Sequence, residues 1–155
     1  EYCAPILERL KDLDVSIYIE PGRAMVANAC ILLAKVQYQK DNGDKHFIIT
    51  ATGMNDMIRP ALYGSWMTII NTTVHPDGET VKSDVVGPIC ESDDFLGKDR
   101  KLNVRNGDIL AVRGAGAYGS SMASTYNTRR LPCEVMVDGD KSYVIKKRQS
   151  YEDIW

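Results

Sequence analysis

The sequence predicts a mainly β protein built as a closed antiparallel barrel or sandwich. Three observations support this fold class. Short apolar, β-rich runs recur along the chain, and turns rich in Gly, Asn and Asp separate them. These runs do not alternate with long helices, as a doubly wound α/β fold would require. With 155 residues, the chain has the length of one domain with a single core.

The first 22 residues differ in character from the rest. Residues 5–13 carry apolar side chains at helical spacing, so we expect a helix there. Residues 15–20 (VSIYIE) then alternate as a strand does, and Pro21 with Gly22 ends the run. This helix–strand pair is an α/β segment that precedes the β-rich remainder.

The remainder contains two turn signals that predict hairpins. Asp-Asn-Gly-Asp at 41–44 separates two apolar runs, and Asp-Gly-Asp at 138–140 does the same near the end of the chain. We therefore expect a mainly β domain after Arg23. Its expected strands lie within residues 24–39, 46–52, 65–74, 83–90 and 107–114 and in a hairpin over 133–147.

Composition excludes several classes of function. A net charge of −2 provides no basic surface for nucleic acid. The chain lacks an apolar run long enough to cross a membrane, and its four cysteines are far apart without C-x-x-C spacing. We therefore expect a cytoplasmic protein with reduced thiols. Two histidines are too few for a convincing metal centre or a Ser-His-Asp triad.

One glycine motif suggests dinucleotide binding, but its surroundings do not support that function. Gly114, Gly116 and Gly119 form G-x-G-x-x-G after a strand-like run. Only a short helix-like stretch follows, and no βαβ unit or suitably placed acidic residue accompanies the motif. Dinucleotide binding is therefore not expected.

Four polar segments stand out against this β background. Glu20–Arg23 places two charges around a Pro-Gly turn, and Arg59 and Tyr63 are spaced to share one face of a helical turn. Cys90 precedes Glu91 in a loop. Tyr118 lies among glycines, where the backbone can approach a ligand closely. Taken singly, each has an ordinary alternative: a turn, a surface pair, a buried thiol or a solvated loop.

In order and spacing, these segments resemble the diaminopimelate decarboxylase family. The matching stretches read EPGR, GMNDMIRPALY, GPICESDDFLGKDR and GAGAYGSSMASTYN, and the resemblance runs from about Ile17 to the end. The family belongs to the alanine-racemase-like class of pyridoxal-phosphate enzymes. It joins an amino-terminal (β/α)8 barrel to a carboxy-terminal Greek-key β-domain. The resemblance implies that residues 1–22 are the last helix and strand of the barrel and that 23–155 form the second domain.

The resemblance also implies a cofactor site. In the family, pyridoxal 5′-phosphate is held on a lysine of the barrel, which this chain does not include. The residues expected to line the cofactor here are Glu20, Pro21, Gly22, Arg23 and Tyr118. A guanidinium and backbone N–H groups suit the phosphate of the cofactor.

A substrate site is implied in the same way. Family members convert meso-2,6-diaminopimelate to L-lysine and CO2, the last step of lysine biosynthesis. Arg23, Arg59 and Tyr63 are expected to bind the carboxylate far from the reacting carbon, because the planar guanidinium forms two parallel bonds to a carboxylate. Glu91 is expected to pair with the distal ammonium, and Tyr118 to contact substrate as well as cofactor.

The family implies that Cys90 is the catalytic proton donor. A thiol can donate a proton near neutral pH, so it suits general-acid work on the carbon that loses CO2. In the family, the Cys-Glu loop enters the site of the opposite subunit. We therefore expect a homodimer with shared active sites.

Two departures from the family pattern are visible. Thr50-Ala51-Thr52-Gly53 replaces the usual Asp-Ala-Gly, so an acidic residue is missing and we assign no role to Ala51. The chain also begins in the middle of an expected helix, without the barrel, so we expect a piece of a longer protein. Its lysines lie in polar or turn segments that would leave them in solvent, except Lys35, whose strand neighbours offer the cofactor no polar partner. We therefore expect the chain alone to be inactive.

Two alternatives remain open. The first keeps the fold and changes the substrate to ornithine, arginine or carboxynorspermidine. Arg59 and Tyr63 favour a distal carboxylate, whereas a diamine-forming enzyme would need acidic groups there. The second alternative is a non-catalytic β-domain that serves binding or dimerisation.

Overall fold

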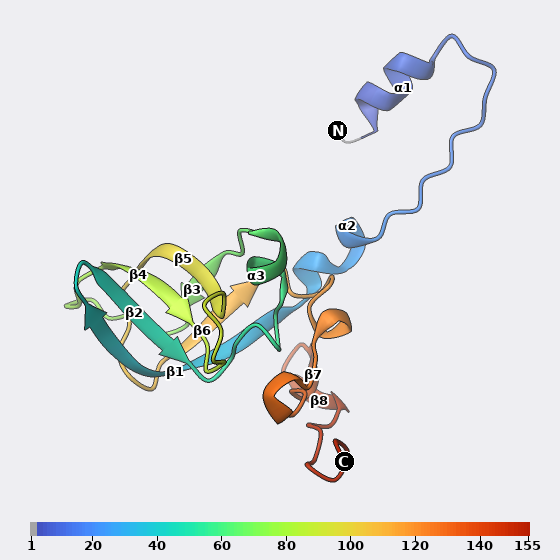
Figure 1. Cartoon of the computed structure of the whole chain (residues 1–155). Helices are drawn as coiled ribbons and strands as arrows, with labels where there is room; N and C mark the ends of the chain where they lie inside the picture. The colour runs from blue at the N-terminus through green and yellow to red at the C-terminus, as the bar shows by residue number, and fades with distance from the viewer. Residues whose placement is uncertain (1–2) are drawn as a thin grey trace.

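The computed structural model describes residues 3–155 and centres on a curled six-stranded sheet (Figure 1). Neighbouring strands are antiparallel except β2 and β4, which are parallel. The two edge strands, β3 and β5, contact each other, so the sheet is nearly closed as a barrel. The prediction of a mainly β, barrel-like fold is therefore confirmed. The strand order is β3 (Ile69–Asn71), β6 (Ile109–Arg113), β1 (Ile31–Asn42), β2 (Lys45–Thr50), β4 (Val81–Val86) and β5 (Phe95–Leu102).

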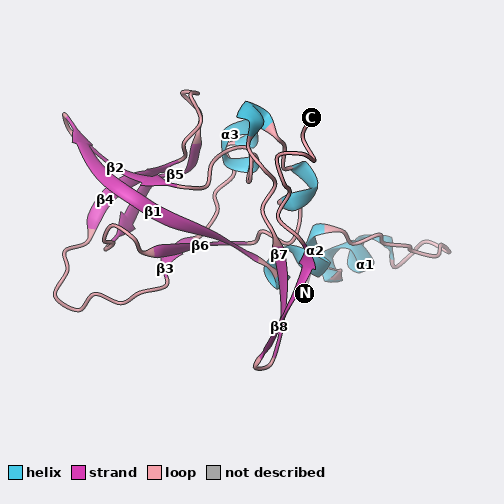
Figure 2. Ribbon diagram, turned by 90° about the horizontal axis from the view of Figure 1, so that it is seen from below, coloured by secondary structure: helices cyan, strands magenta, loops and turns pink. Residues whose placement is uncertain are grey.

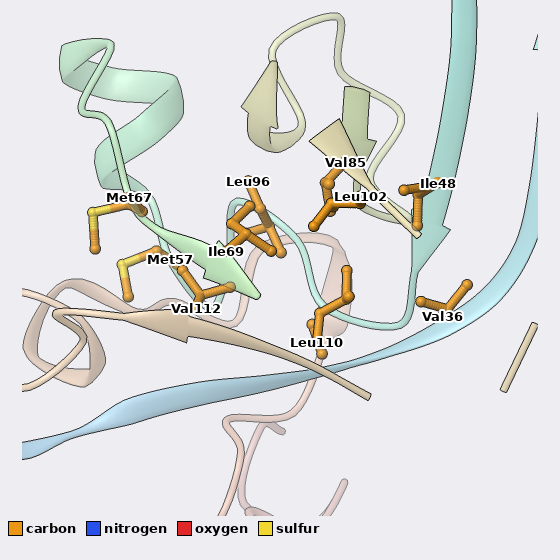
Figure 3. Close-up of a cluster of buried hydrophobic side chains, with 11 residues drawn as sticks. Val36, Ile48, Met57, Met67, Ile69, Val85, Leu96, Leu102, Leu110 and Val112 are labelled. Atoms are coloured by element: carbon orange, nitrogen blue, oxygen red, sulfur yellow. The ribbon is translucent and has the colours of Figure 1, made fainter. Parts of the chain in front are cut away.

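The core fills the inside of this barrel. On β1, Ala34 and Val36 point inward and are fully buried, whereas their neighbours Leu33 and Lys35 are exposed, as the twofold period of a strand requires. Met57 and Met67 occupy the part of the core nearest α3 (Arg59–Tyr63) (Figure 3). The buried apolar cluster comprises Ala34, Val36, Ile48, Met57, Met67, Ile69, Val85, Leu96, Leu102, Leu110 and Val112.

Both expected hairpins are present. Gly43, at φ +60°, forms the turn between β1 and β2, a conformation that glycine adopts without steric cost. Gly139, at φ +59°, does the same between β7 (Glu134–Asp138) and β8 (Lys141–Lys146). The second hairpin is a separate two-stranded sheet.

The amino-terminal segment differs from its prediction. Helix α1 (Ala4–Leu10) ends three residues before the expected boundary. Residues 15–20 are not a strand, because the described chain offers them no ladder partner. The expected division into 1–22 and 23–155 stays a prediction.

The start of the long run at 24–39 is helical, which corrects the strand expected there. Helix α2 (Arg23–Val26) and the 3-10 helix η1 (Ala27–Ala29) precede β1. Gly116 N–H donates to the Ala27 carbonyl over 3.0 Å, and a Cβ on Gly116 would lie 1.8 Å from the Val26 carbonyl oxygen. This close tertiary approach holds the turn and overrides the local apolar pattern.

Three further strands differ from expectation. Residues 65–74 form only the short β3, and β4 ends at Val86, before Gly87 and Pro88, because proline cannot donate to a ladder. Strand β5 was not predicted, since its charged residues resembled a loop. Asp99, at φ +57°, interrupts its alternation and forms an exposed ion pair with Lys82 at 2.8 Å.

The helical segments after α1 gather at the end of the barrel where β1 begins and β6 ends, whereas α1 lies apart from the barrel (Figure 1 and Figure 2). Besides α2 and α3, they include the 3-10 helices η2 (Ser120–Met122) and η3 (Tyr126–Thr128). In the part of the chain that the structure describes, no helix is long and apolar enough to cross a membrane.

Candidate functional site

Helix α3 brings Arg59 and Tyr63 together, as their spacing predicts. Arg59 begins the helix and Tyr63 ends it, after which Gly64 turns the chain at φ +60°. The guanidinium carbon of Arg59 lies 5.1 Å from the centroid of the Tyr63 ring. At this distance a cation interacts favourably with the face of an aromatic ring.

Tyr118 approaches the same guanidinium from the loop after β6. Its ring centroid lies 5.4 Å from the Arg59 guanidinium carbon, so the cation lies close to two tyrosine rings. Tyr118 adopts φ +60°, which is uncommon for a residue with a side chain. Within residues 3–155, the Arg59 side chain forms no hydrogen bond or ion pair, and its Nε is buried without an acceptor.

The segment before α2 adjoins this group. A Cβ on Gly22 would lie 3.5 Å from the Tyr118 hydroxyl, and a Cβ on Gly114 would lie 4.0 Å from Nη2 of Arg23. The structure therefore brings four predicted site residues to one end of the barrel: Arg23, Arg59, Tyr63 and Tyr118. We call these four residues the arginine–tyrosine group.

A pocket opens beside this group. It has a volume of about 780 Å³, and Glu20–Ala24 form most of its wall, together with Cys3, Ile19, Ala27 and Asn28. Arg23 provides a positive charge at this wall. The pocket therefore has the size and the cationic donor that an anionic, phosphate-bearing cofactor needs.

Cys90 and Glu91 lie in a second group. Both are exposed in the loop after β4, and the Tyr126 hydroxyl donates a hydrogen bond to the Glu91 carboxylate. That hydrogen bond and the Glu91 charge raise the pKa of Tyr126. Among the described residues, no hydrogen bond, ion pair or cation–π contact joins Cys90 or Glu91 to the arginine–tyrosine group. The structure thus divides the expected site into two parts.

Sequence reasoning missed Tyr126 and Arg129. Tyr126 lies at the edge of a second pocket of about 670 Å³, whose other lining residues are Met54, Asn55, Ile58, Ser124, Thr125 and Asn127. Arg129 donates to the Ala51 carbonyl over 2.6 Å. The sequence offered one signal for Tyr126, its place near the end of the matching stretch GAGAYGSSMASTYN. It did not reveal that this tyrosine contacts Glu91.

Comparison with known proteins now identifies the family. The family model described as the C-terminal sheet domain of pyridoxal-dependent decarboxylases matches residues 13–116. The chain belongs to this family. The resemblance inferred from the four polar stretches is therefore confirmed.

Individual relatives agree with this assignment. The diaminopimelate decarboxylases of Haemophilus influenzae and Vibrio cholerae are 51% and 48% identical over the whole chain. The chain spans only 38% and 37% of the length of those proteins.

Solved structures show the same fold. Diaminopimelate decarboxylase from Helicobacter pylori, complexed with L-lysine, matches 99% of the chain with a TM-score of 0.86 at 43% identity, and the match covers 38% of that protein. A lysine/ornithine decarboxylase from Vibrio vulnificus, complexed with cadaverine, matches 84% of the chain with a TM-score of 0.72 at 28% identity and covers 36% of its own chain.

Proposed function

We propose that this chain is the carboxy-terminal part of a diaminopimelate decarboxylase, which converts meso-2,6-diaminopimelate to L-lysine and CO2. The observation that carries the proposal is the position of Arg59. Its guanidinium lies close to two tyrosine rings and forms no hydrogen bond within the described chain. A planar cation without a protein acceptor suits the distal carboxylate of the substrate.

The arginine–tyrosine group orients the substrate in this proposal. Arg59 and the Tyr63 hydroxyl bind the distal carboxylate, and Arg23 adds positive charge nearby. The rings of Tyr63 and Tyr118 are about half exposed, so both can contact a ligand. An ornithine-type substrate has no carboxylate at that position and would leave the Arg59 cation uncompensated.

Pyridoxal phosphate, held on a lysine outside this chain, supplies the electron sink for decarboxylation when it is bound. Glu20, Pro21, Gly22 and Arg23 line the pocket beside Tyr118, where the backbone N–H of Gly22 and the guanidinium of Arg23 would bind its phosphate end. A Cβ on Gly22 would lie 3.5 Å from the Tyr118 hydroxyl, so this part of the pocket wall adjoins the tyrosine.

Cys90 donates the proton in the second half of the reaction. The proton passes from Sγ to the carbon that has lost CO2, and solvent then returns a proton to the sulfur. Glu91 pairs with the distal ammonium of the substrate, and the Tyr126 hydroxyl holds the Glu91 carboxylate in place.

The separation of the two groups supports a homodimer with shared sites. Cys90 and Glu91 form no hydrogen bond or ion pair with Arg59 in the described chain, so we propose that they serve the site of the partner subunit. Cytoplasmic location stays a prediction, to which the four unpaired cysteines contribute.

Turnover by the longer protein that contains this chain tests the proposal. Lysine formation from meso-diaminopimelate would be measured beside putrescine formation from ornithine at equal concentrations. We expect efficient conversion of diaminopimelate and much slower conversion of ornithine. A preference for ornithine would favour the other substrate class, and no turnover of either amino acid would favour a non-catalytic module.

A further inference from the structure

Asp94 is a buried carboxylate that binds the backbone of two separate loops. Only 4% of its surface is exposed. Its Oδ1 accepts a hydrogen bond from Met54 N–H at 2.6 Å, and its Oδ2 accepts one from Ile89 N–H at 2.5 Å. Each carboxylate oxygen therefore holds a different part of the chain.

Two glycines allow both loops to pack against this carboxylate. A Cβ on Gly53 would lie 2.6 Å from Oδ1 of Asp94, and a Cβ on Gly87 would lie 2.5 Å from Oδ2. The Gly87 Cβ would also lie 2.4 Å from the Cα of Gly53, so the two loops touch at these positions. No side chain fits at either position without displacing backbone or carboxylate.

Each loop leads directly to one part of the proposed site. The loop that begins at Gly53 continues through Met54 into helix α3 and Arg59. The other loop carries Cys90 and Glu91 immediately after Ile89. Backbone hydrogen bonds also close this second loop on Asp94, from Asp94 N–H to the Glu91 carbonyl and from Gly87 N–H to the Asp94 carbonyl, each 3.1 Å long.

We propose that Asp94 is a positioning residue that fixes the loop of Cys90 and Glu91 relative to helix α3 and Arg59. Its catalytic consequence rests on the proposed function, whereas the anchoring itself does not. If Cys90 serves the partner subunit, the same carboxylate links a donor for one active site to a carboxylate-binding residue of the other.

A carboxylate suits this position better than the amide of asparagine would. Burial raises the pKa of Asp94, although hydrogen bonds from Met54 and Ile89 and the charge of Arg129 oppose this shift. An amide would avoid the cost of burying charge. It has one acceptor oxygen, however, and its NH2 would face one of the two N–H donors.

Hydrogen exchange in the 155-residue chain tests the anchoring. In Asp94→Asn, the backbone amides of Met54 and Ile89 should exchange at least about tenfold faster. Each now donates to a charged oxygen, and the asparagine amide offers one neutral oxygen for both. The matched control is Asp93→Asn, which alters an exposed neighbour and should leave both amides unchanged. Unchanged exchange in Asp94→Asn would overturn the proposal.

If Asp94→Asn does not fold, a pH titration of the unmodified chain by NMR tests the same anchoring. The amide proton resonances of Met54 and Ile89 should shift together, with one common midpoint, as the Asp94 carboxyl titrates. Burial raises the pKa that sets this midpoint, and the hydrogen bonds from Met54 and Ile89 and the charge of Arg129 lower it. The carboxyl group of Asp56 is also nearby, and the Asp94 charge raises the pKa of Asp56. Two different midpoints, or no shift, would show that one carboxyl does not bind both amides.

Kinetics of the longer protein test the catalytic role. With cofactor loading verified by absorbance, Asp94→Asn should lower kcat for diaminopimelate by about 10- to 100-fold, because catalytic groups misplaced by about 1 Å lose that much rate. Faster amide exchange with an unchanged kcat would overturn the positioning role. If the unmodified protein does not decarboxylate diaminopimelate, the proposed function fails while the anchoring is judged by the amide data alone.

Discussion

Replacement of Arg59 by lysine tests whether substrate binding needs the planar guanidinium or only a positive charge. Lysine keeps the charge but loses one of two parallel hydrogen bonds to a carboxylate, and a charge-assisted bond contributes about 1.5–3 kcal/mol. The two cation–π contacts of Arg59, at 5.1 and 5.4 Å, lie within the protein with or without substrate, so weakening them lowers stability and does not enter the binding energy. We therefore expect a loss of binding free energy of about 1.5–3 kcal/mol, which raises KM for diaminopimelate about 10- to 150-fold.

The assay is steady-state lysine formation by the longer protein, with cofactor content measured by absorbance in every variant. Arg105→Lys is the matched control, since the exposed Arg105 lies at the other end of β6 from the arginine–tyrosine group. It should leave KM unchanged. A KM for Arg59→Lys within threefold of the unmodified enzyme would refute carboxylate recognition by this guanidinium.

Three further predictions concern other parts of the molecule. Tyr126→Phe removes the hydroxyl that binds Glu91, so kcat/KM for diaminopimelate should fall about three- to tenfold while cofactor absorbance is unchanged; equal kinetics would contradict this role. Burial alone raises the pKa of Asp108, but hydrogen bonds, including those from His75 and Asn71, outweigh burial and lower it, so its stabilisation is present above its unfolded pKa and is lost as pH falls. In chemical denaturation, the free energy of unfolding of Asp108→Asn should therefore be about 1–3 kcal/mol lower than that of the unmodified chain at pH 7, and this difference should shrink toward pH 2. A difference that does not change with pH would contradict the linkage. The 155-residue chain mixed with pyridoxal phosphate should develop no absorbance band of lysine-bound cofactor, and a clear band would show that one of its own lysines holds it.

Local sequence signals predicted the local parts of the fold. The turns at Gly43 and Gly139 were identified because short Gly-Asp sequences favour positive φ between strands. The contact between Arg59 and Tyr63 followed from their spacing on one helical turn. Strand β5 was missed because its outward-facing charges hide the apolar positions Leu96 and Leu102.

Contacts between distant segments could not be derived from local pattern. Nothing in the spacing of Arg59 and Tyr118 indicates that they meet, because the fold of the barrel sets that distance. The same holds for the Tyr126 hydroxyl on Glu91. The resemblance to a family indicated which residues would matter, and the structure added how they divide into two groups and that Asp94 anchors both loops.

The central claim is that the arginine–tyrosine group binds the carboxylate that remains on the product. A crystal structure of the longer protein with bound L-lysine tests this claim most directly. We predict that the lysine carboxylate lies within hydrogen-bond distance of the Arg59 guanidinium and the Tyr63 hydroxyl. A product carboxylate bound elsewhere, with the Arg59 guanidinium still unpaired, would contradict it.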